Sequence, residues 1–310
     1  MEPRKKPYVT PSSLVRRSSS GGGRRTVIVV LVFFAGVYVL AQGPARPPIK
    51  IGFMVPLSGA NAQNGRDILN GFLLLLEETG YQAGDRTIEL IVEDDEGIPA
   101  VGLTKARKLV ERDGVHMMGG ALLTSTGYAL APYIDSQGIP MVYPVVSADD
   151  LTQRRRAKWI IRTGYTGSQP NHPFGEYAYD TLKLKTVATI ALDYGFGWEA
   201  VGGFRRTFEG KGGRVTQSLW APLSIHDFAP YLAQISRNVD AVYALFLGRT
   251  ALQFMRQYEE YGLKTRVPLI GMGTTTDEHV LPAMGDEAIG VITVLHYSGA
   301  LDTPANRRFA

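Results

Sequence analysis

The sequence predicts an α/β protein built on parallel sheets. Short apolar runs alternate with amphipathic segments along the chain from Ile49 onward. Glycines such as Gly80 and Gly114 directly follow several amphipathic segments, which is typical of helix C-termini. Because a helix between two strands returns the chain to the same edge of a sheet, this order favours parallel strands covered by helices. A chain of 310 residues more often folds into two sheets than into one.

The expected strands are short and rich in β-branched and aromatic residues, and the expected helices lie between them. The strands are predicted at residues 49–55, 87–93, 115–119, 141–143, 159–162, 186–192, 241–247, 267–271 and 290–295. The helices are predicted at residues 67–79, 101–113, 125–136, 175–183, 197–209, 227–236 and 251–261. The polar, basic stretch at residues 149–164 interrupts the alternation, so we expect it to carry the chain from one sheet to the next.

The N-terminal segment has the features of an export signal. Residues 1–25 carry a net charge of +6, so the remaining 285 residues carry −2 of the total of +4, and the body has no basic surplus for binding nucleic acid. The uncharged residues 26–41 number 16, short of the roughly 17–25 that span a bilayer. We therefore expect a secretory signal cleaved after Ala41, with an uncleaved membrane anchor as the alternative.

Composition and motifs argue against an enzyme. The chain has no cysteine, so it offers neither a thiolate metal site nor a cysteine nucleophile. It contains no glycine-rich dinucleotide fingerprint after the first strand, no P-loop and no nucleophile elbow. Its five histidines are scattered without the spacing of metal ligands. We therefore expect no catalytic residue, no metal and no cofactor.

The first strand, residues 49–55, is followed by a hydroxyl residue at the edge of its sheet. It breaks at Pro56 into Leu57 and Ser58. In open α/β sheets, ligands bind at the carboxyl ends of the strands. Ser58 is therefore expected at the mouth of a ligand crevice.

Four segments in order resemble the leucine/isoleucine/valine-binding protein family, the type 1 periplasmic binding proteins of ABC importers. The resemblance covers about residues 49–310 and is carried by IKIGFMVPLSG, GGALLTSTGYALAPYIDSQGIPMVYPVVSADDLTQ, WIIRTG and LDYGFGWEA. It implies two Rossmann-like lobes joined by hinge crossovers. Residues 1–48 would form the tail, signal and linker, 49–162 lobe 1, 163–289 lobe 2, and 290–310 the return to lobe 1. Because members continue beyond a segment like residues 302–310, we expect a C-terminally truncated chain.

The resemblance also implies which first-lobe residues hold the ligand. The hydroxyls of Thr124 and Ser125, at the start of a helix, match the loop that binds a ligand carboxylate. Val145 would offer backbone groups and Ser147 a hydroxyl, with Ser58 as a supporting contact. Hydroxyls and free N–H groups at a helix N-terminus suit an anion. The alternative is that these hydroxyls only cap their helices.

In the second lobe, the resemblance places Phe196 as an aromatic cover over the ligand. Leu247 stands at a strand end where amino-acid-binding members often carry tyrosine. Gly273 stands where those members carry an acid for the ligand ammonium, and the nearest acid, Asp277, is four residues further on. A buried ammonium without a counter-charge is heavily penalised. We therefore expect an aromatic or other apolar carboxylic acid as the ligand rather than an α-amino acid.

The resulting functional expectation is an extracytoplasmic solute-binding protein of an ABC importer. It would be a periplasmic monomer that binds a small carboxylate between its lobes and delivers it to the permease subunits in the membrane. The alternative is a membrane-anchored ligand-sensing module of the same fold that acts in signalling.

Overall fold

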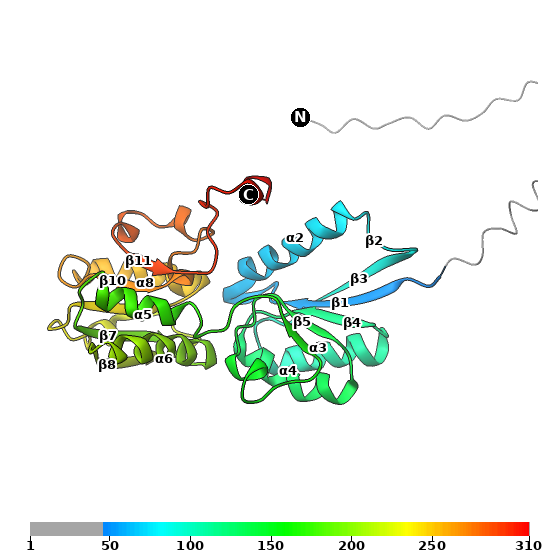
Figure 1. Cartoon of the computed structure of the whole chain (residues 1–310), viewed down its shortest axis with the longest axis horizontal. Coiled ribbons are helices and arrows are strands. Elements are labelled where there is room, and N and C mark those ends of the chain that lie inside the picture. The colour runs from blue at the N-terminus through cyan, green and yellow to red at the C-terminus, as the bar shows by residue number, and fades with distance from the viewer. Residues whose placement is uncertain (1–45, 310) are drawn as a thin grey trace, which may run out of the picture. The chain divides into compact units, whose positions relative to one another are not determined.

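The computed structural model describes residues 46–309 (Figure 1). The expected signal at residues 26–41 lies outside the described residues. Within residues 46–309, none of the helices has the length and apolar character needed to cross a membrane.

The first sheet has six strands, in the order β2-β3-β1-β4-β5-β6. The strands are β1 (Ile49–Val55), β2 (Gln82–Ala83), β3 (Arg86–Asp94), β4 (Met117–Gly120), β5 (Met141–Tyr143) and β6 (Ile160–Arg162). All are parallel except β2, which pairs antiparallel with β3. Because β1, β4 and β5 are neighbouring parallel strands, the segments that follow them all begin at the same edge of the sheet.

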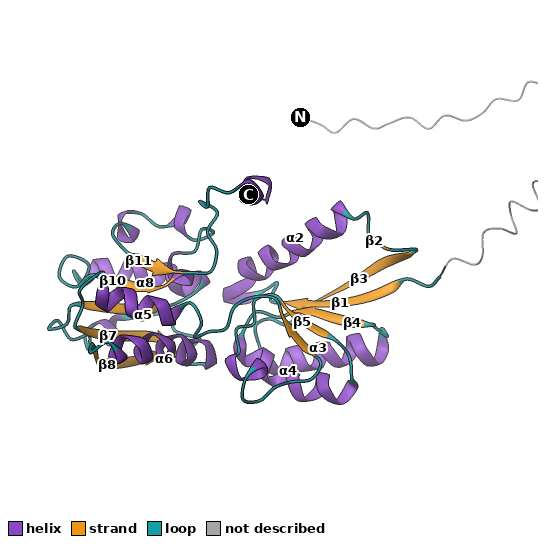
Figure 2. Cartoon of the chain, viewed as in Figure 1, coloured by secondary structure: helices purple, strands orange, loops and turns teal. Residues whose placement is uncertain are grey.

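Helices cover both faces of this sheet (Figure 2). They are α2 (Ala62–Glu78), α3 (Pro99–Arg107), which continues as a π-helical turn at Lys108–Arg112, and α4 (Thr124–Gln137). On the side of α3 and α4 lies a core that includes the fully buried Met54, Leu109, Met118 and Leu130. On the side of α2, Phe72 stacks on Phe53 of β1 with 4.7 Å between ring centroids.

The second sheet has five parallel strands, in the order β11-β10-β9-β7-β8. The strands are β7 (Thr186–Leu192), β8 (Arg214–Ala221), β9 (Ala241–Leu245), β10 (Leu269–Met272) and β11 (Ile292–Val294). The helices are α5 (Asn171–Asp180), α6 (Gly195–Gly210), α7 (Ala229–Leu232), α8 (Gly248–Glu260) and, near the end of the chain, α9 (Pro304–Phe309). Short 3₁₀ turns occur at Gly59–Asn61, Asp149–Thr152, Gly273–Thr276, Leu281–Ala283 and Asp286–Ala288.

The core of this second half is strongly aromatic. Phe204 and Phe208 of α6 stack on each other, and Phe246 and Phe254 meet Phe228 at 4.9 and 5.3 Å between ring centroids. We call the first sheet with α2 to α4 the first lobe, and the second sheet with α5 to α8 the second lobe.

The predicted α/β class with two mostly parallel sheets is confirmed, but three details differ. Neither β2 nor the edge strand β8 was predicted. Both residues of β2 are exposed, and most residues of β8 alternate between exposed and partly buried. Residues 290–310 were predicted in the return to lobe 1, whereas β11 pairs with β10 in the second sheet. The strand Ile292–Val294 extends the free edge of β10, so the second sheet runs five residues past the expected boundary at 289.

One glycine fixes how the first sheet leads into the site. Gly120 ends β4 with φ of 100°, and a Cβ there would lie 2.2 Å from the carbonyl oxygen of Met54. Only glycine fits this approach of backbone to backbone. The chain can therefore turn sharply from β4 into α4, which begins at Thr124.

Candidate functional site

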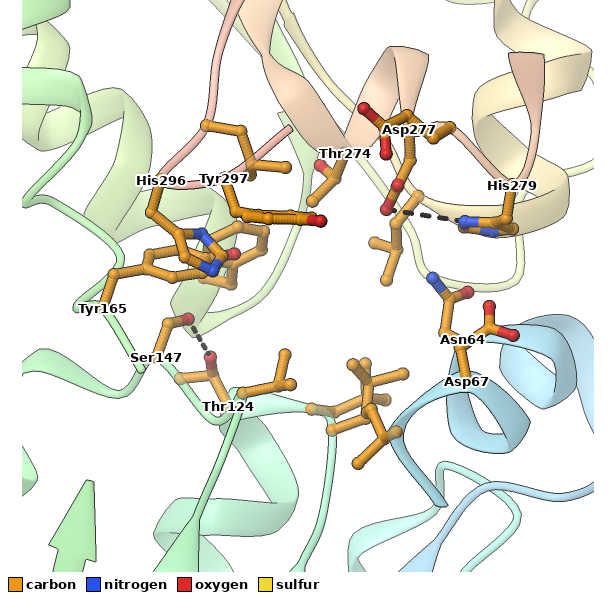
Figure 3. A pocket seen from close by; sticks show the side chains of 18 of the residues that line it. Asn64, Asp67, Thr124, Ser147, Tyr165, Thr274, Asp277, His279, His296 and Tyr297 are labelled. Atoms are coloured by element: carbon orange, nitrogen blue, oxygen red, sulfur yellow. Dashed lines mark hydrogen bonds and ion pairs between the residues drawn. The ribbon is translucent and has the colours of Figure 1, made fainter. Parts of the chain in front are cut away.

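A cavity of about 370 Å³ lies where the carboxyl ends of the two sheets face each other (Figure 3). Its volume falls within the roughly 300–1,000 Å³ typical of small-molecule sites. Lining residues follow β4 and β5 in the first lobe and β7, β9 and β10 in the second. Both lobes thus contribute the strand ends at which α/β proteins bind their ligands.

The first-lobe wall of the cavity presents two buried hydroxyls. Thr124 and Ser147 are 1% and 4% exposed, and their side-chain oxygens lie 3.2 Å apart within hydrogen-bond distance. Val145 and Leu123 line the cavity beside them. Within this pair, one hydroxyl donates its proton to the oxygen of the other. The second hydroxyl then still has its own proton to donate to a ligand, and the first can still accept a hydrogen bond.

Three helices begin at this cavity. Thr124 is the first residue of α4, Tyr194 is the N-cap of α6, and Leu247 is the N-cap of α8. All three residues line the cavity. The first turn of a helix carries unpaired N–H groups and a partial positive charge, so three such ends favour an anion.

Aromatic rings form a further part of the lining. Phe196 meets Tyr165 and Tyr194 edge to face, with ring centroids 6.5 and 6.2 Å apart. The imidazole of His296 lies against Tyr165 at 4.3 Å between centroids. Burial lowers the pKa of His296 and so favours the neutral form of its ring. This aromatic wall offers flat apolar surface of the kind that covers a planar ligand.

Polar groups gather on the opposite side of the cavity from Thr124 and Ser147 (Figure 3). An Oδ2 of Asp277 lies 3.5 Å from Nδ1 of His279, and this interaction raises the pKa of His279. Thr274 and, from α2, Asn64 and Asp67 line the same side. We call Thr274, Asp277 and His279 the second-lobe wall.

The two lobes touch beside the cavity. A Cβ on Gly195, the first residue of α6, would lie 2.8 Å from Cγ2 of Thr124. Tyr128 of α4 donates a hydrogen bond of 2.6 Å to Oε1 of Glu199 on α6. Burial raises the pKa of Glu199 to about 7, although the bond from Tyr128 works in the opposite direction. The contact between α4 and α6 thus carries a carboxyl group that titrates near neutral pH.

The structure brings together five of the eight site residues that the sequence predicted. Thr124, Val145, Ser147, Phe196 and Leu247 line the cavity, and whether they contact a ligand stays a prediction.

The other three predicted residues, Ser58, Ser125 and Gly273, are not among the lining residues. Ser58 is exposed before the turn at Gly59–Asn61. The hydroxyl of Ser125 is buried without a hydrogen-bond partner among the described residues. Gly273 faces Leu295, whose Cβ would lie 2.6 Å from an added Cβ.

The acidic side of the cavity was not predicted from the sequence. Residues 271–276 contain no acid, yet Asp277 and Glu278 line the cavity together with Asp67. The reason is the 3₁₀ turn at Gly273–Thr276, which follows β10 directly and carries the chain back toward the strand ends. The local sign of this segment in the sequence is its polar run at residues 274–279, three threonines followed by Asp277, Glu278 and His279.

Comparisons with known proteins agree with this architecture. A profile of the periplasmic binding protein family matches residues 48–310. The Leu/Ile/Val-binding protein homolog 6 of Brucella melitensis is 32% identical over 278 residues, which cover 88% of this chain and 70% of the relative.

Two solved structures of ABC transporter solute-binding proteins from Rhodopseudomonas palustris are each 31% identical to this chain. The alignments cover 84% of this chain and 72% of theirs, with TM-scores of 0.80 and 0.79. The first is a complex with benzoate and the second a complex with 3,4-dihydroxybenzoic acid.

Proposed function

The chain belongs to the periplasmic binding protein family and is an ABC-type substrate-binding protein, and from this premise we propose that its cavity binds a small aromatic carboxylate. The proposal includes export to the periplasm and delivery of the ligand to a membrane permease. The observation that carries it is the buried hydroxyl pair of Thr124 and Ser147 at the N-terminus of α4, beside an aromatic wall.

The hydroxyl pair suits a carboxylate for reasons of charge and geometry. A carboxylate accepts hydrogen bonds only, and the first turn of α4 together with two hydroxyls supplies donors. Bonds to a charged group are worth roughly 1.5–3 kcal/mol each. Because Thr124 and Ser147 are almost fully buried, solvent competes little for these bonds.

The aromatic wall supports a ring as the body of the ligand. Tyr165, Tyr194 and Phe196 are each at most 9% exposed, so their faces are held in place by packing. A flat ring that packs against them gains offset or edge-to-face contacts beyond the area it buries. A relative of 31% identity has been solved with benzoate, a ligand of this shape and charge.

An α-amino acid fits the cavity less well. Its ammonium and carboxylate sit on the same carbon, so the acid that pairs with the ammonium must lie next to the carboxylate site. Asp67 and Asp277 lie across the cavity from Thr124 and Ser147 (Figure 3). Asp277 is also already paired with His279.

Binding and release follow from the position of the cavity between the lobes. The carboxylate docks first on Thr124 and Ser147, and the second lobe then closes its aromatic rings over the ligand. The closed form is the one offered to the permease. The family relationships favour this transport role over the signalling role considered from the sequence.

Calorimetric titration of the chain with benzoate and with leucine tests the proposal. We expect benzoate to bind and to raise the melting temperature, and leucine to do neither. The measurement should be made near neutral pH, where benzoate is fully ionised. Tight binding of leucine, or no binding of benzoate and its ring-substituted analogues, would refute the aromatic carboxylate as ligand.

A further inference from the structure

We propose that the hydrogen bond between Tyr128 and Glu199 is a latch that holds the two lobes closed over the ligand, so that both side chains contribute to affinity without touching the ligand. Neither residue lines the cavity. This inference rests on the proposed function and adds to it two positioning residues outside the site.

The bond belongs to a contact between one helix of each lobe. Tyr128 comes four residues after Thr124 on α4, and Glu199 comes four residues after Gly195 on α6, so each lies one turn further along the same face of its helix. A Cβ on Gly195 would lie 2.8 Å from Cγ2 of Thr124 and 3.5 Å from Cε2 of Tyr128. The first two turns of α4 and α6 therefore pack together. A rotation that moves α6 away from Thr124 also separates Tyr128 from Glu199.

The hydroxyl of Tyr128 is oriented toward the second lobe. Its oxygen accepts a hydrogen bond of 3.2 Å from the N–H of Asp150, which belongs to the first lobe. Its proton is donated to Oε1 of Glu199 over 2.6 Å. Both side chains are partly buried, and a hydrogen bond to a carboxylate is about twice as strong as one between neutral groups. The first lobe thus fixes the donor, and closure brings the acceptor to it.

Glu199 also lies against the segment that joins the lobes, residues 163–170 between β6 and α5. A Cβ on Gly167 of this segment would lie 2.7 Å from Oε2 of Glu199. The N–H of Gly167 donates a hydrogen bond of 2.8 Å to the carbonyl of Ser147, whose hydroxyl is on the first-lobe wall. Gly167 therefore contacts both Glu199 and a residue of the ligand site, which places the latch beside the joint between the lobes.

A latch of this kind acts on release more than on capture. The ligand docks while the lobes are apart, when Tyr128 and Glu199 do not meet, so the association rate does not depend on the pair. Release requires that the lobes separate, so each dissociation breaks the bond. Loss of the bond should therefore raise the dissociation rate and leave the association rate nearly unchanged.

The test is titration and stopped-flow kinetics of benzoate binding to the full chain and its variants at pH 8, above the pKa of about 7 of Glu199. For Tyr128→Phe we expect the dissociation rate to rise and the affinity to fall, each roughly 10-fold, as the loss of one hydrogen bond to a charged group allows. Glu199→Ala should have the same effect. Glu199→Gln should lose less, because its amide oxygen still accepts from Tyr128.

Tyr133→Phe is the matched control. Tyr133 of α4 donates a hydrogen bond of 3.0 Å to Oε1 of Glu111, so α4 carries a second tyrosine–glutamate bond, but both of its partners belong to the first lobe. Its loss should leave both rates unchanged. The double variant of Tyr128→Phe and Glu199→Ala should lose no more than either single variant, because the two side chains act through one bond. Melting temperatures show whether each variant is folded.

The outcomes separate the inference from the proposal beneath it. Tyr128→Phe and Glu199→Ala with the affinity and dissociation rate of the unchanged chain overturn the latch and leave the aromatic carboxylate in place. Equal losses in Tyr128→Phe and Tyr133→Phe, losses that add in the double variant, or a loss confined to the association rate also overturn it. If neither benzoate nor its ring-substituted analogues bind the unchanged chain, the proposed function falls and the latch falls with it.

Discussion

The two walls of the cavity differ in charge and in how their polar groups are paired. On the first-lobe wall, Thr124 and Ser147 are neutral, buried and within hydrogen-bond distance of each other. On the second-lobe wall, a carboxylate oxygen of Asp277 lies 3.5 Å from Nδ1 of His279 and raises the pKa of His279, and Thr274 and His279 each have a buried atom without a partner among the described residues.

This difference suggests that the two walls recognise different parts of the ligand. A paired hydroxyl set at a helix N-terminus suits the carboxylate that every ligand of the proposed class shares. A wall with a partly exposed carboxylate, that of Asp277, is sensitive to the charge and polarity of the substituents that a particular ligand carries. We therefore expect the first-lobe wall to set whether a ligand binds, and the second-lobe wall to set which one binds best.

The largest expected effect comes from removing the first-lobe hydroxyls together. Thr124→Ala combined with Ser147→Ala loses two hydrogen bonds to a charged group, about 1.5–3 kcal/mol each. The affinity for benzoate should fall by a factor of roughly 10–150 for each bond. Calorimetric titration measures the loss, and the melting temperature of the free protein shows whether the variant is folded.

Ser125→Ala is the control for this double variant. Ser125 is in the same first turn of α4 and its hydroxyl is buried, but it does not line the cavity. Its affinity for benzoate should stay unchanged. Equal losses in the control and in the double variant would mean that the first-lobe wall acts through the stability of α4 and not through contact with the ligand.

The same contrast explains how much of the site could be predicted from the sequence. Thr124 and Ser147 were named from the family resemblance, and the local pattern agrees with it, because each is a hydroxyl residue that follows a strand and begins a helix or a turn. Parallel neighbouring strands end at the same edge of the sheet, so Thr124 and Ser147 are expected to lie close together there. Phe196 and Leu247, which follow β7 and β9, were named from the family resemblance.

The second-lobe wall and the α2 residues on the same side of the cavity could not be predicted, because both depend on the path of the chain in space. Asp277 faces the cavity only because a 3₁₀ turn stands between it and the strand. Asn64 and Asp67 arrive from α2, which begins five residues before the predicted helix start at 67. They line the same cavity as Asp277 although about 210 residues separate them in the sequence, and no local pattern encodes this.

An intermediate effect is expected from a methyl group placed between the lobes. Gly195→Ala puts a Cβ at 2.8 Å from Cγ2 of Thr124, closer than real carbon contacts. Either the Thr124 side chain must turn out of its position or the second lobe must shift away from the first-lobe wall, at a cost of about 1–3 kcal/mol. Affinity for benzoate should fall roughly 5–150-fold, measured by titration.

Gly202→Ala on the same helix is the matched control. Nothing lies within 4 Å of a Cβ built at Gly202. Alanine there should stabilise α6 by up to about 1 kcal/mol and leave affinity unchanged. If Gly195→Ala also leaves affinity unchanged, the close approach of α6 to Thr124 is not needed for binding.

The smallest effect concerns the hydrogen bond between Tyr128 and Glu199, which joins the two lobes. Burial raises the pKa of Glu199 from 4.5 to about 7, with Asp149 adding to the rise and Arg162 opposing it. Below about pH 4.5 the carboxyl is protonated in both the folded and the unfolded chain, so it has no effect on stability. As the pH rises from about 4.5 to 7, the folded chain keeps a proton that the unfolded chain has lost, so stability falls and then levels off above 7.

Glu199→Gln isolates this contribution, because glutamine resembles the protonated carboxyl at every pH. Melting curves at pH 5, 6, 7 and 8 should show the variant gaining on the unchanged chain as the pH rises. Allowing for solvent screening of a partly buried group, the gain should reach about 1 kcal/mol, or ~2–4 °C. Asp95, buried in the first lobe with a pKa raised to about 6, lowers stability over a similar range, but it is present in both proteins and cancels. A difference between the two proteins that stays constant from pH 5 to 8 would mean that Glu199 does not titrate in this range, and that the contact between the lobes is insensitive to pH.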